Sequence, residues 1–155
     1  MEINETELIQ SLDKIGIKGS FQEDNKQIFS SLSINGFDYP MFIRRLQGGQ
    51  LMQLITFIPC TLEGGTENDV GRLLHMINKE LDMPGFCCDE ESKTVFYRLV
   101  VPCMNQNVDE ALFHAYVNTT KQVCTMFGTI IQAIAVKAMK LEEMLEKAKE
   151  LAAKK

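Results

Sequence analysis

Apolar positions in the first part of the chain change from a helical to an alternating period. The N-terminal segment carries them at helical spacing, at Leu8, Ile9, Leu12 and Ile15. Asn4, followed three residues later by Glu7, resembles a capping pair at the start of this helix. Gly16 and Gly19 then predict its end. We therefore expect one short amphipathic helix before the first strand.

The next apolar positions predict a meander of three antiparallel strands. Residues Gln27–Ile34 alternate in polarity and lead into Asn35-Gly36, a strong hairpin signal. The return strand covers Phe37–Leu46 and contains Pro40, which removes a ladder donor and predicts an edge position or a bulge. The third strand, Leu51–Ile58, is apolar on both faces, and this pattern is typical of a central strand.

A helix, a hairpin and a long helix are predicted next. A hydroxyl cap at Thr66 opens the first of these helices, and Pro84-Gly85 ends it. Its apolar stripe consists of Val70, Leu73, Leu74, Ile77 and Leu81. Residues 85–103 read as strand, acidic turn and strand, and a long helical region begins near Asn107 and Glu110. The order α-β-β-β-α-β-β-α predicts an α+β fold, an antiparallel sheet with helices on one face.

The apolar stripe narrows in the last part of the chain. Spacings of four and three residues connect Ile134, Ala138, Leu141, Leu145, Ala148 and Ala152. Charged residues flank this stripe and form favourable i,i+4 pairs, such as Glu143 with Lys147. We predict a single α+β domain over residues 1–136 and a projecting helical extension over residues 137–155. The margins of this stripe, Met144 and Leu151, join Leu141 and Leu145 as predicted partner-binding residues.

Composition and charge exclude several classes of function. The chain has 155 residues, enough for one domain with a real core, and a net charge of −5. An acidic surface disfavours nucleic acid and anionic lipid as partners. No apolar run approaches the roughly 20 residues that cross a bilayer, and no secretory signal is present. Five cysteines, an odd number, favour a reducing cytoplasmic setting with free thiols.

The candidate catalytic, redox and metal-binding residues are better explained by structural roles. Neighbouring strand residues point to opposite faces, so Cys87 and Cys88 cannot both bind one metal ion or form a redox pair. The two histidines, His75 and His114, have no partners at the spacing of a triad or ligand set. Glycines before Thr66 could cradle an anion, but the lysine of a phosphate loop is missing. We therefore predict no catalytic residue, no cofactor and no metal.

The order of elements and several motifs resemble the bacterial YbjN-like domain family. The motifs are Ile77-Asn78-Lys79-Glu80-Leu81, Gly85-Phe86, Val95-Phe96-Tyr97-Arg98-Leu99-Val100-Val101-Pro102 and Asp109-Glu110-Ala111-Leu112-Phe113. The resemblance covers about residues 26–134. This family shares its fold with the type III secretion chaperones, which implies a secretion-chaperone-like fold and a homodimer. It also implies a dimer helix at residues 67–81, and we predict dimer contacts at Val70, Leu73, Leu74 and Ile77.

These observations together predict a non-enzymatic, cytoplasmic protein-binding module. The resemblance implies that apolar sheet and helix surfaces bind a client or partner polypeptide. Two alternatives stay open. One is a small-molecule sensor or enzyme with a pocket between sheet and helices, and the other is a scaffold subunit whose last helix docks into a larger assembly.

Overall fold

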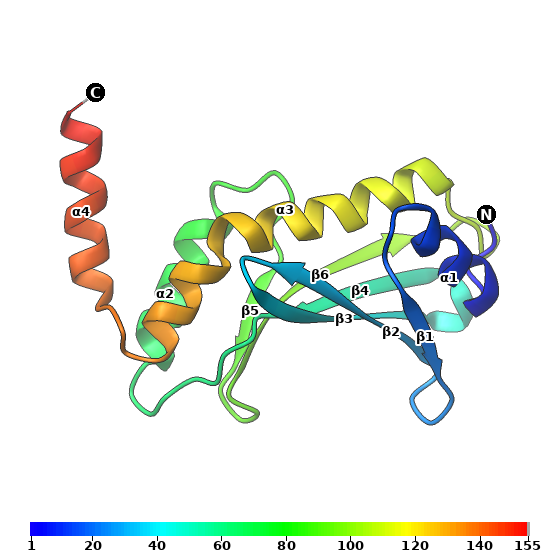
Figure 1. Ribbon diagram of the computed structural model, residues 1–155, viewed down its shortest axis with the longest axis horizontal. Helices are drawn as coiled ribbons and strands as arrows, with labels where there is room; N and C mark the ends of the chain where they lie inside the picture. The colour runs from blue at the N-terminus through cyan, green and yellow to red at the C-terminus, as the bar shows by residue number, and fades with distance from the viewer. Residues whose placement is uncertain (155) are drawn as a thin grey trace.

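The computed structural model describes residues 1–154 and has an α+β architecture (Figure 1). Its helices are α1 (Glu5–Lys14), α2 (Glu67–Asn78), α3 (Glu110–Ala135) and α4 (Leu141–Ala153), with a 3-10 turn η1 (Gln47–Gly49). Its strands are β1 (Gly19–Gln22), β2 (Gln27–Ile34), β3 (Phe37–Leu46), β4 (Leu51–Phe57), β5 (Phe86–Asp89) and β6 (Thr94–Pro102). The strands form one antiparallel sheet in the order β1-β2-β3-β4-β6-β5.

Three helices cover one face of this sheet. In Figure 1, α3 runs above the strands, with α2 at the left end of the sheet and α1 at its right end, while α4 projects from the left end of the domain. The predicted fold class is confirmed, and β2 and β3 have the predicted bounds. The sequence interpretation missed β1, a four-residue edge strand that pairs with β2. Four residues that include a glycine give too little alternation to be read as a strand.

Pro40 lies inside an interior strand without interrupting the sheet. β3 pairs with β2 along its whole length but with β4 only from Met41 onward. Pro40 therefore sits just beyond the paired part of β3 and β4, level with the last residue of β4, so that side of the strand is locally an edge. The predicted edge position is correct for this part of β3, and the predicted central position of β4 is confirmed by its pairing with β3 and β6.

The hydrophobic core lies between the sheet and the three helices. Inward-pointing apolar and aromatic strand residues with at most 1% exposure are Tyr39, Met41, Ile43, Met52, Leu54, Val95 and Tyr97. Helix α3 comes so close to the sheet that a Cβ on Gly128 would overlap the hydroxyl oxygen of Tyr39 and lie 2.9 Å from its Cζ atom. Gly128 is therefore the position that allows α3 to pack on the sheet.

The long C-terminal helix that the stripe suggested is interrupted. Lys137 has φ of +58°, and its amide donates to the carbonyl of Ile134 while the Ala138 amide donates to that of Ala133. These two bonds form a Schellman motif, with lysine where glycine is usual. α3 thus ends at Ala135, and α4 starts in a new direction at Leu141.

Candidate protein-binding surface

Four phenylalanines form a row across the face of the sheet that no helix covers. They are Phe29 on β2, Phe42 on β3, Phe57 on β4 and Phe96 on β6. Their ring centroids are separated by 5.4, 6.0 and 5.7 Å in that order. Strand register places Phe29 opposite Phe42 and Phe57 opposite Phe96, so the row crosses four strands. We call these four residues the phenylalanine row and this side of the sheet the open face.

The open face exposes apolar surface around the row. All four rings are only half-buried, and Val100 beside them is 46% exposed. The other apolar residues on this face are Leu46, Leu51, Ile55 and Cys87. A contiguous apolar patch of this kind marks an interaction site more often than scattered exposed residues do. Aromatic side chains also contribute most of the energy at protein interfaces.

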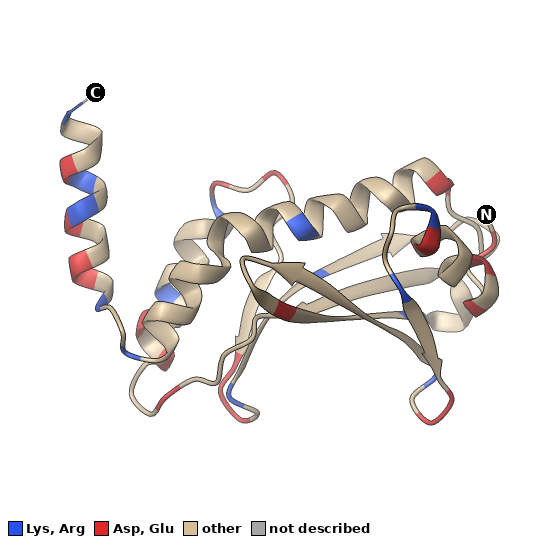
Figure 2. Ribbon diagram, in the orientation of Figure 1, with Lys and Arg blue, Asp and Glu red and all other residues tan. Residues whose placement is uncertain are grey.

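Two arginines adjoin the row. The Nε atom of Arg44 donates to the amide oxygen of Gln53 at 2.7 Å, and Gln53 is only 6% exposed. The guanidinium of Arg98 lies over the ring of Phe96, 6.0 Å from its centroid. Within residues 1–154, neither guanidinium forms an ion pair. The sheet otherwise carries few charges, as Figure 2 shows by its mostly tan strands.

Two carboxylates of the described strands, Asp38 and Asp89, lie toward the other end of the open face. Asp38 is at the start of β3, about 20 Å along the strand from Arg44 at 3.4 Å per residue. Asp89 on β5 lies at the same end, because β3 and β6 run in the same direction. Along the strands, the two aspartates therefore lie at one end of the open face, Arg98 lies level with Phe42, and Arg44 lies two residues farther from the aspartates.

The predicted dimer helix exists, but its apolar stripe faces inward. Val70, Leu73, Leu74 and Ile77 are 0–6% exposed and belong to the core of the same chain. In this position a second subunit cannot touch them unless the core opens. These four side chains pack against α3 and β5 of their own chain, and a dimer contact through α2 stays a prediction.

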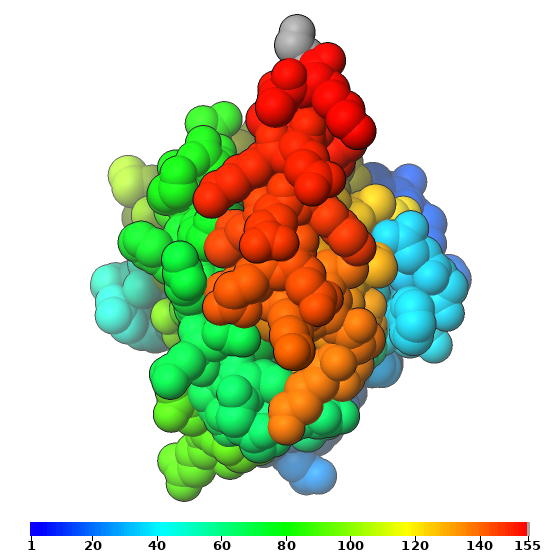
Figure 3. Space-filling model, turned by 90° about the vertical axis from the view of Figure 1, so that its left-hand side faces the viewer, coloured from blue at the N-terminus to red at the C-terminus, as the bar shows by residue number. Residues whose placement is uncertain are grey.

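The four predicted partner-binding residues of the C-terminal stripe are divided between the core and the solvent. Leu141 is fully buried, and Met144 and Leu145 are partly buried against the core. Leu151 is 65% exposed. Figure 3 shows the first turns of α4 (orange) seated on the domain and its last turns (red) rising beyond it. Only the second half of α4 is therefore free for a partner.

The cysteines behave as small apolar residues. Cys87 and Cys88 point to opposite faces of β5, as strand geometry predicts, and Cys88 packs against the core. Burial raises the pKa of the Cys60 thiol to about 11 and that of Cys124 to about 12. Thiols with such pKa values stay protonated at neutral pH and are poor nucleophiles and ligands. No cluster of three or more metal-binding side chains occurs among residues 1–154.

The histidines and the glycine loop have local structural partners. His75 is exposed on α2, whereas Nε2 of His114 lies 2.8 Å from the hydroxyl of Ser11 on α1. The amide of Gly65 donates to the Glu67 carboxylate at 2.9 Å, so the helix's own side chain takes the place of an anion. Thr66 does not cap α2 by its side chain, which instead bonds to a carbonyl in the preceding loop.

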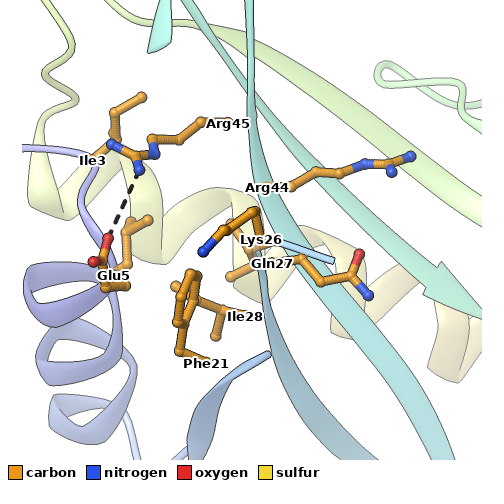
Figure 4. Close-up of a pocket in the computed structure, with 10 residues that line it drawn as sticks. Ile3, Glu5, Phe21, Lys26, Gln27, Ile28, Arg44 and Arg45 are labelled. Carbon is orange, nitrogen blue, oxygen red and sulfur yellow. Dashed lines mark ion pairs between the residues drawn. The ribbon is translucent and has the colours of Figure 1, made fainter. Parts of the chain in front are cut away.

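A cleft near the N-terminus is too small for a metabolite. It lies between α1 and the ends of β2 and β3, where Arg45 forms an ion pair with Glu5 at 3.8 Å (Figure 4). Its space for a water-sized molecule is about 10 Å³, which is close to one water. In the same view Lys26 lies beside the ring of Phe21, while Arg44 extends away toward the open face.

The sequence contained a signal for the phenylalanine row. β4 is apolar on both faces, and β2 and β3 each carry a phenylalanine on the polar side of their alternation. The two-sided pattern of β4 predicted a central strand, which its pairing with β3 and β6 confirms. The structure shows that one of its two faces is open. No helix within residues 1–154 is both long and apolar enough to cross a membrane.

The fold and the open face define a small α+β protein with one covered and one exposed sheet surface. Residues 5–133 match the family YbjN, described as "Putative bacterial sensory transduction regulator". This match covers most of the sequence, and the chain belongs to the YbjN family. The predicted family resemblance is thereby confirmed.

Comparison with solved structures agrees on the fold. The crystal structure of YbjN from E. coli, titled "a putative transcription regulator", matches with a TM-score of 0.60 and 14% identity, over 84% of this chain and 90% of that one. The HopA1-SchA chaperone-effector complex matches with a TM-score of 0.43 and 12% identity, over 76% of this chain and 91% of that one. Among curated proteins there is no significant match.

Proposed function

We propose that this protein is a non-enzymatic binding module that holds a polypeptide segment on its open face. The phenylalanine row is the observation that supports this function. Its four rings are adjacent, half-exposed and held by a rigid sheet, so a partner that covers them buries a large aromatic surface without reorganising the domain. The family description suggests that such binding serves regulation.

Binding on the face is favoured over the addition of a strand to the sheet edge. The two edge strands, β1 and β5, have four residues each. Edges this short offer few backbone hydrogen bonds to an incoming strand, and short edge strands are a common protection against such pairing. The central strands of the open face are longer and carry the aromatic side chains.

The proposal is tested by peptide binding with matched variants. An array of random peptides of about 15 residues, probed with the labelled protein, should show binding to apolar sequences. The double variant Phe42→Ser and Phe96→Ser should lose most of this binding, by about tenfold or more, because it removes two central rings. Met126→Ser is the control, because Met126 is an exposed apolar residue, 67% accessible, on α3 and away from the open face. Equal binding by all three proteins would show that the open face is not the site.

Self-association is a separate part of the proposal. Because the stripe of α2 is in the core, a homodimer must use other surfaces, and the open face and the end of α4 are the apolar surfaces described above. The mass in solution of the full chain and of a chain that ends at residue 139 tests this. A dimer that persists without residues 140–155 would exclude α4 as the main contact.

A further inference from the structure

We propose that the open face selects a polypeptide segment that carries carboxylates beside its apolar residues, and that Arg44 and Arg98 are the residues that select it. This inference rests on the proposed function and names the chemistry of its partner. It follows from the two guanidinium groups that adjoin the phenylalanine row, from the lack of an ion pair to either of them within residues 1–154, and from the position of Asp38 and Asp89 farther along the face.

Both arginines are held in place before a partner arrives. The Gln53 amide fixes Arg44 through a 2.7 Å hydrogen bond, and the ring of Phe96 supports Arg98. A guanidinium that is already oriented loses less side-chain entropy when it binds a carboxylate. β4 separates the two strands that carry them, so the two backbones lie about 10 Å apart. Two carboxylates on alternate residues of an extended segment lie about 7 Å apart, and the length of the arginine side chains covers the remaining distance.

The selectivity for an acidic segment comes from the free-energy cost of covering the two arginines without a counter-charge. A segment that covers Phe42, Ile55 and Phe96 also removes water from Arg98, which shares the register row of Phe42 and Ile55. Partial burial of a guanidinium without a counter-charge is unfavourable, and a carboxylate in the segment offsets this loss. A lysine at the same place adds repulsion. An acidic apolar segment is therefore favoured over a neutral one, and a neutral one over a basic one.

The far end of the face sets the direction of the segment. Asp38 and Asp89 lie beyond the phenylalanine row, at the end opposite the arginines. The Asp89 carboxylate accepts hydrogen bonds from the Glu91 amide at 3.0 Å and from the Ser92 hydroxyl at 2.8 Å. These hydrogen bonds lower its pKa, so it stays charged. The acidic end of a bound segment is thus directed toward Arg44 and Arg98 and away from the two aspartates.

Three labelled peptides that differ only in charge test the proposal. Each has about 12 residues, with leucine and phenylalanine at alternate positions and glutamate, glutamine or lysine between them. Fluorescence anisotropy should give affinities in the order glutamate, glutamine, lysine, with about tenfold between neighbours, as expected for two partly exposed ion pairs. The advantage of the glutamate peptide should shrink between about 0.05 M and about 0.5 M salt.

Charge reversal on the protein completes the test. The double variant Arg44→Glu and Arg98→Glu should invert the order of the three peptides. Arg72→Glu, on the exposed side of α2, should leave the order unchanged. An order that the double reversal does not change would overturn the role of the arginines.

The outcomes separate this inference from the proposed function. If the three peptides bind equally and Phe42→Ser with Phe96→Ser abolishes binding, the binding function stands and the charge selectivity is wrong. If no peptide binds, or if the phenylalanine variant binds as the parent does, both are wrong. If the full chain is a dimer that dissociates both on reversal of the arginines and on deletion of residues 140–155, the occupant is α4 of a second copy and a foreign segment is excluded.

Discussion

The two faces of the sheet use the same strands and similar residues, yet they differ in what covers them. The covered face carries Tyr39, Leu54 and Tyr97 at 0–1% exposure under three helices. The open face carries phenylalanines on the same strands, and they remain half-exposed. The comparison shows that an apolar residue in a strand is not necessarily buried. A face that keeps four aromatic rings at the surface is available for binding, whereas the other face is committed to stability.

The largest expected effect on stability comes from shortening side chains on the two faces of β4. Leu54→Ala removes a buried side chain from the covered face of β4 and should cost about 2–5 kcal/mol in the free energy of unfolding. Phe57→Ala, on the open face of the same strand, should cost only about 1 kcal/mol, because its ring is half-exposed. Urea unfolding of both variants measures the two values. Equal losses would mean that the open face is part of the folding core.

The second largest effect on stability is expected where α3 comes closest to the covered face. Gly128→Ala should destabilise the protein by about 1–3 kcal/mol, because the new methyl group overlaps the hydroxyl of Tyr39. Tyr39→Phe in the same chain should recover part of this loss, since the hydroxyl is buried and has no hydrogen-bond partner. Gly71→Ala in α2 is the control. It meets no atom within 4 Å and should stabilise the helix by up to about 1 kcal/mol, so a similar loss at both glycines would contradict the close contact.

A smaller effect on stability is expected at the C-terminal end of α3. Lys137 has a left-handed backbone conformation, which glycine adopts without strain. Lys137→Gly should therefore raise the free energy of unfolding by up to about 1 kcal/mol. Lys137→Ala removes the same charge but keeps the Cβ atom, and it should give no gain. Thermal unfolding of both variants checks this, and a gain in both would assign the effect to charge instead.

The smallest effect concerns an ion pair that connects α2 to the β5–β6 turn. Glu67 accepts a hydrogen bond from Lys93 at 2.7 Å, and this bond is the main cause that lowers the pKa of the Glu67 carboxyl from 4.5 to about 2. A lowered folded-state pKa contributes stability that is present above pH 4.5 and is lost as the pH falls toward 2.

Stability measured against pH tests this pair. Glu67→Gln should be less stable than the parent at pH about 7, and the difference should vanish near pH about 2. Urea midpoints at several pH values give the comparison. Lys93→Met should reduce the same difference, because it removes the main partner. A gap between parent and Glu67→Gln that stays constant down to pH about 2 would contradict the assignment.

Much of the fold follows from local sequence signals. The bounds of β2 and β3 were predictable because Asn35-Gly36 fixes the hairpin and the flanking residues alternate in polarity. The Asn4 cap was predictable for a similar reason, and its side chain accepts from the Glu7 amide at 2.8 Å. Local signals failed at Lys137, because no glycine or proline marks the end of α3.

The candidate site could be predicted only in part. Strand period placed the phenylalanines on one side of β2, β3 and β6, but it could not show that these strands are neighbours through β4. The stripe Val70, Leu73, Leu74 and Ile77 was assigned to a dimer, because a sequence cannot tell burial in its own core from burial against a partner. Both questions depend on contacts between residues that are far apart in the chain.

The sequence by itself determined most of the elements, their order and the absence of the motifs of several common catalytic sites. Periodicity, turn residues and caps act over a few residues, so they can be read without the fold. Tertiary structure decided which apolar face was covered, because α3 can cover only one side of the sheet, and it approaches that side where Gly128 faces Tyr39. It also decided that Phe29, Phe42, Phe57 and Phe96 stand together beside Arg44 and Arg98, because strand order and register bring residues nearly 70 positions apart onto one surface.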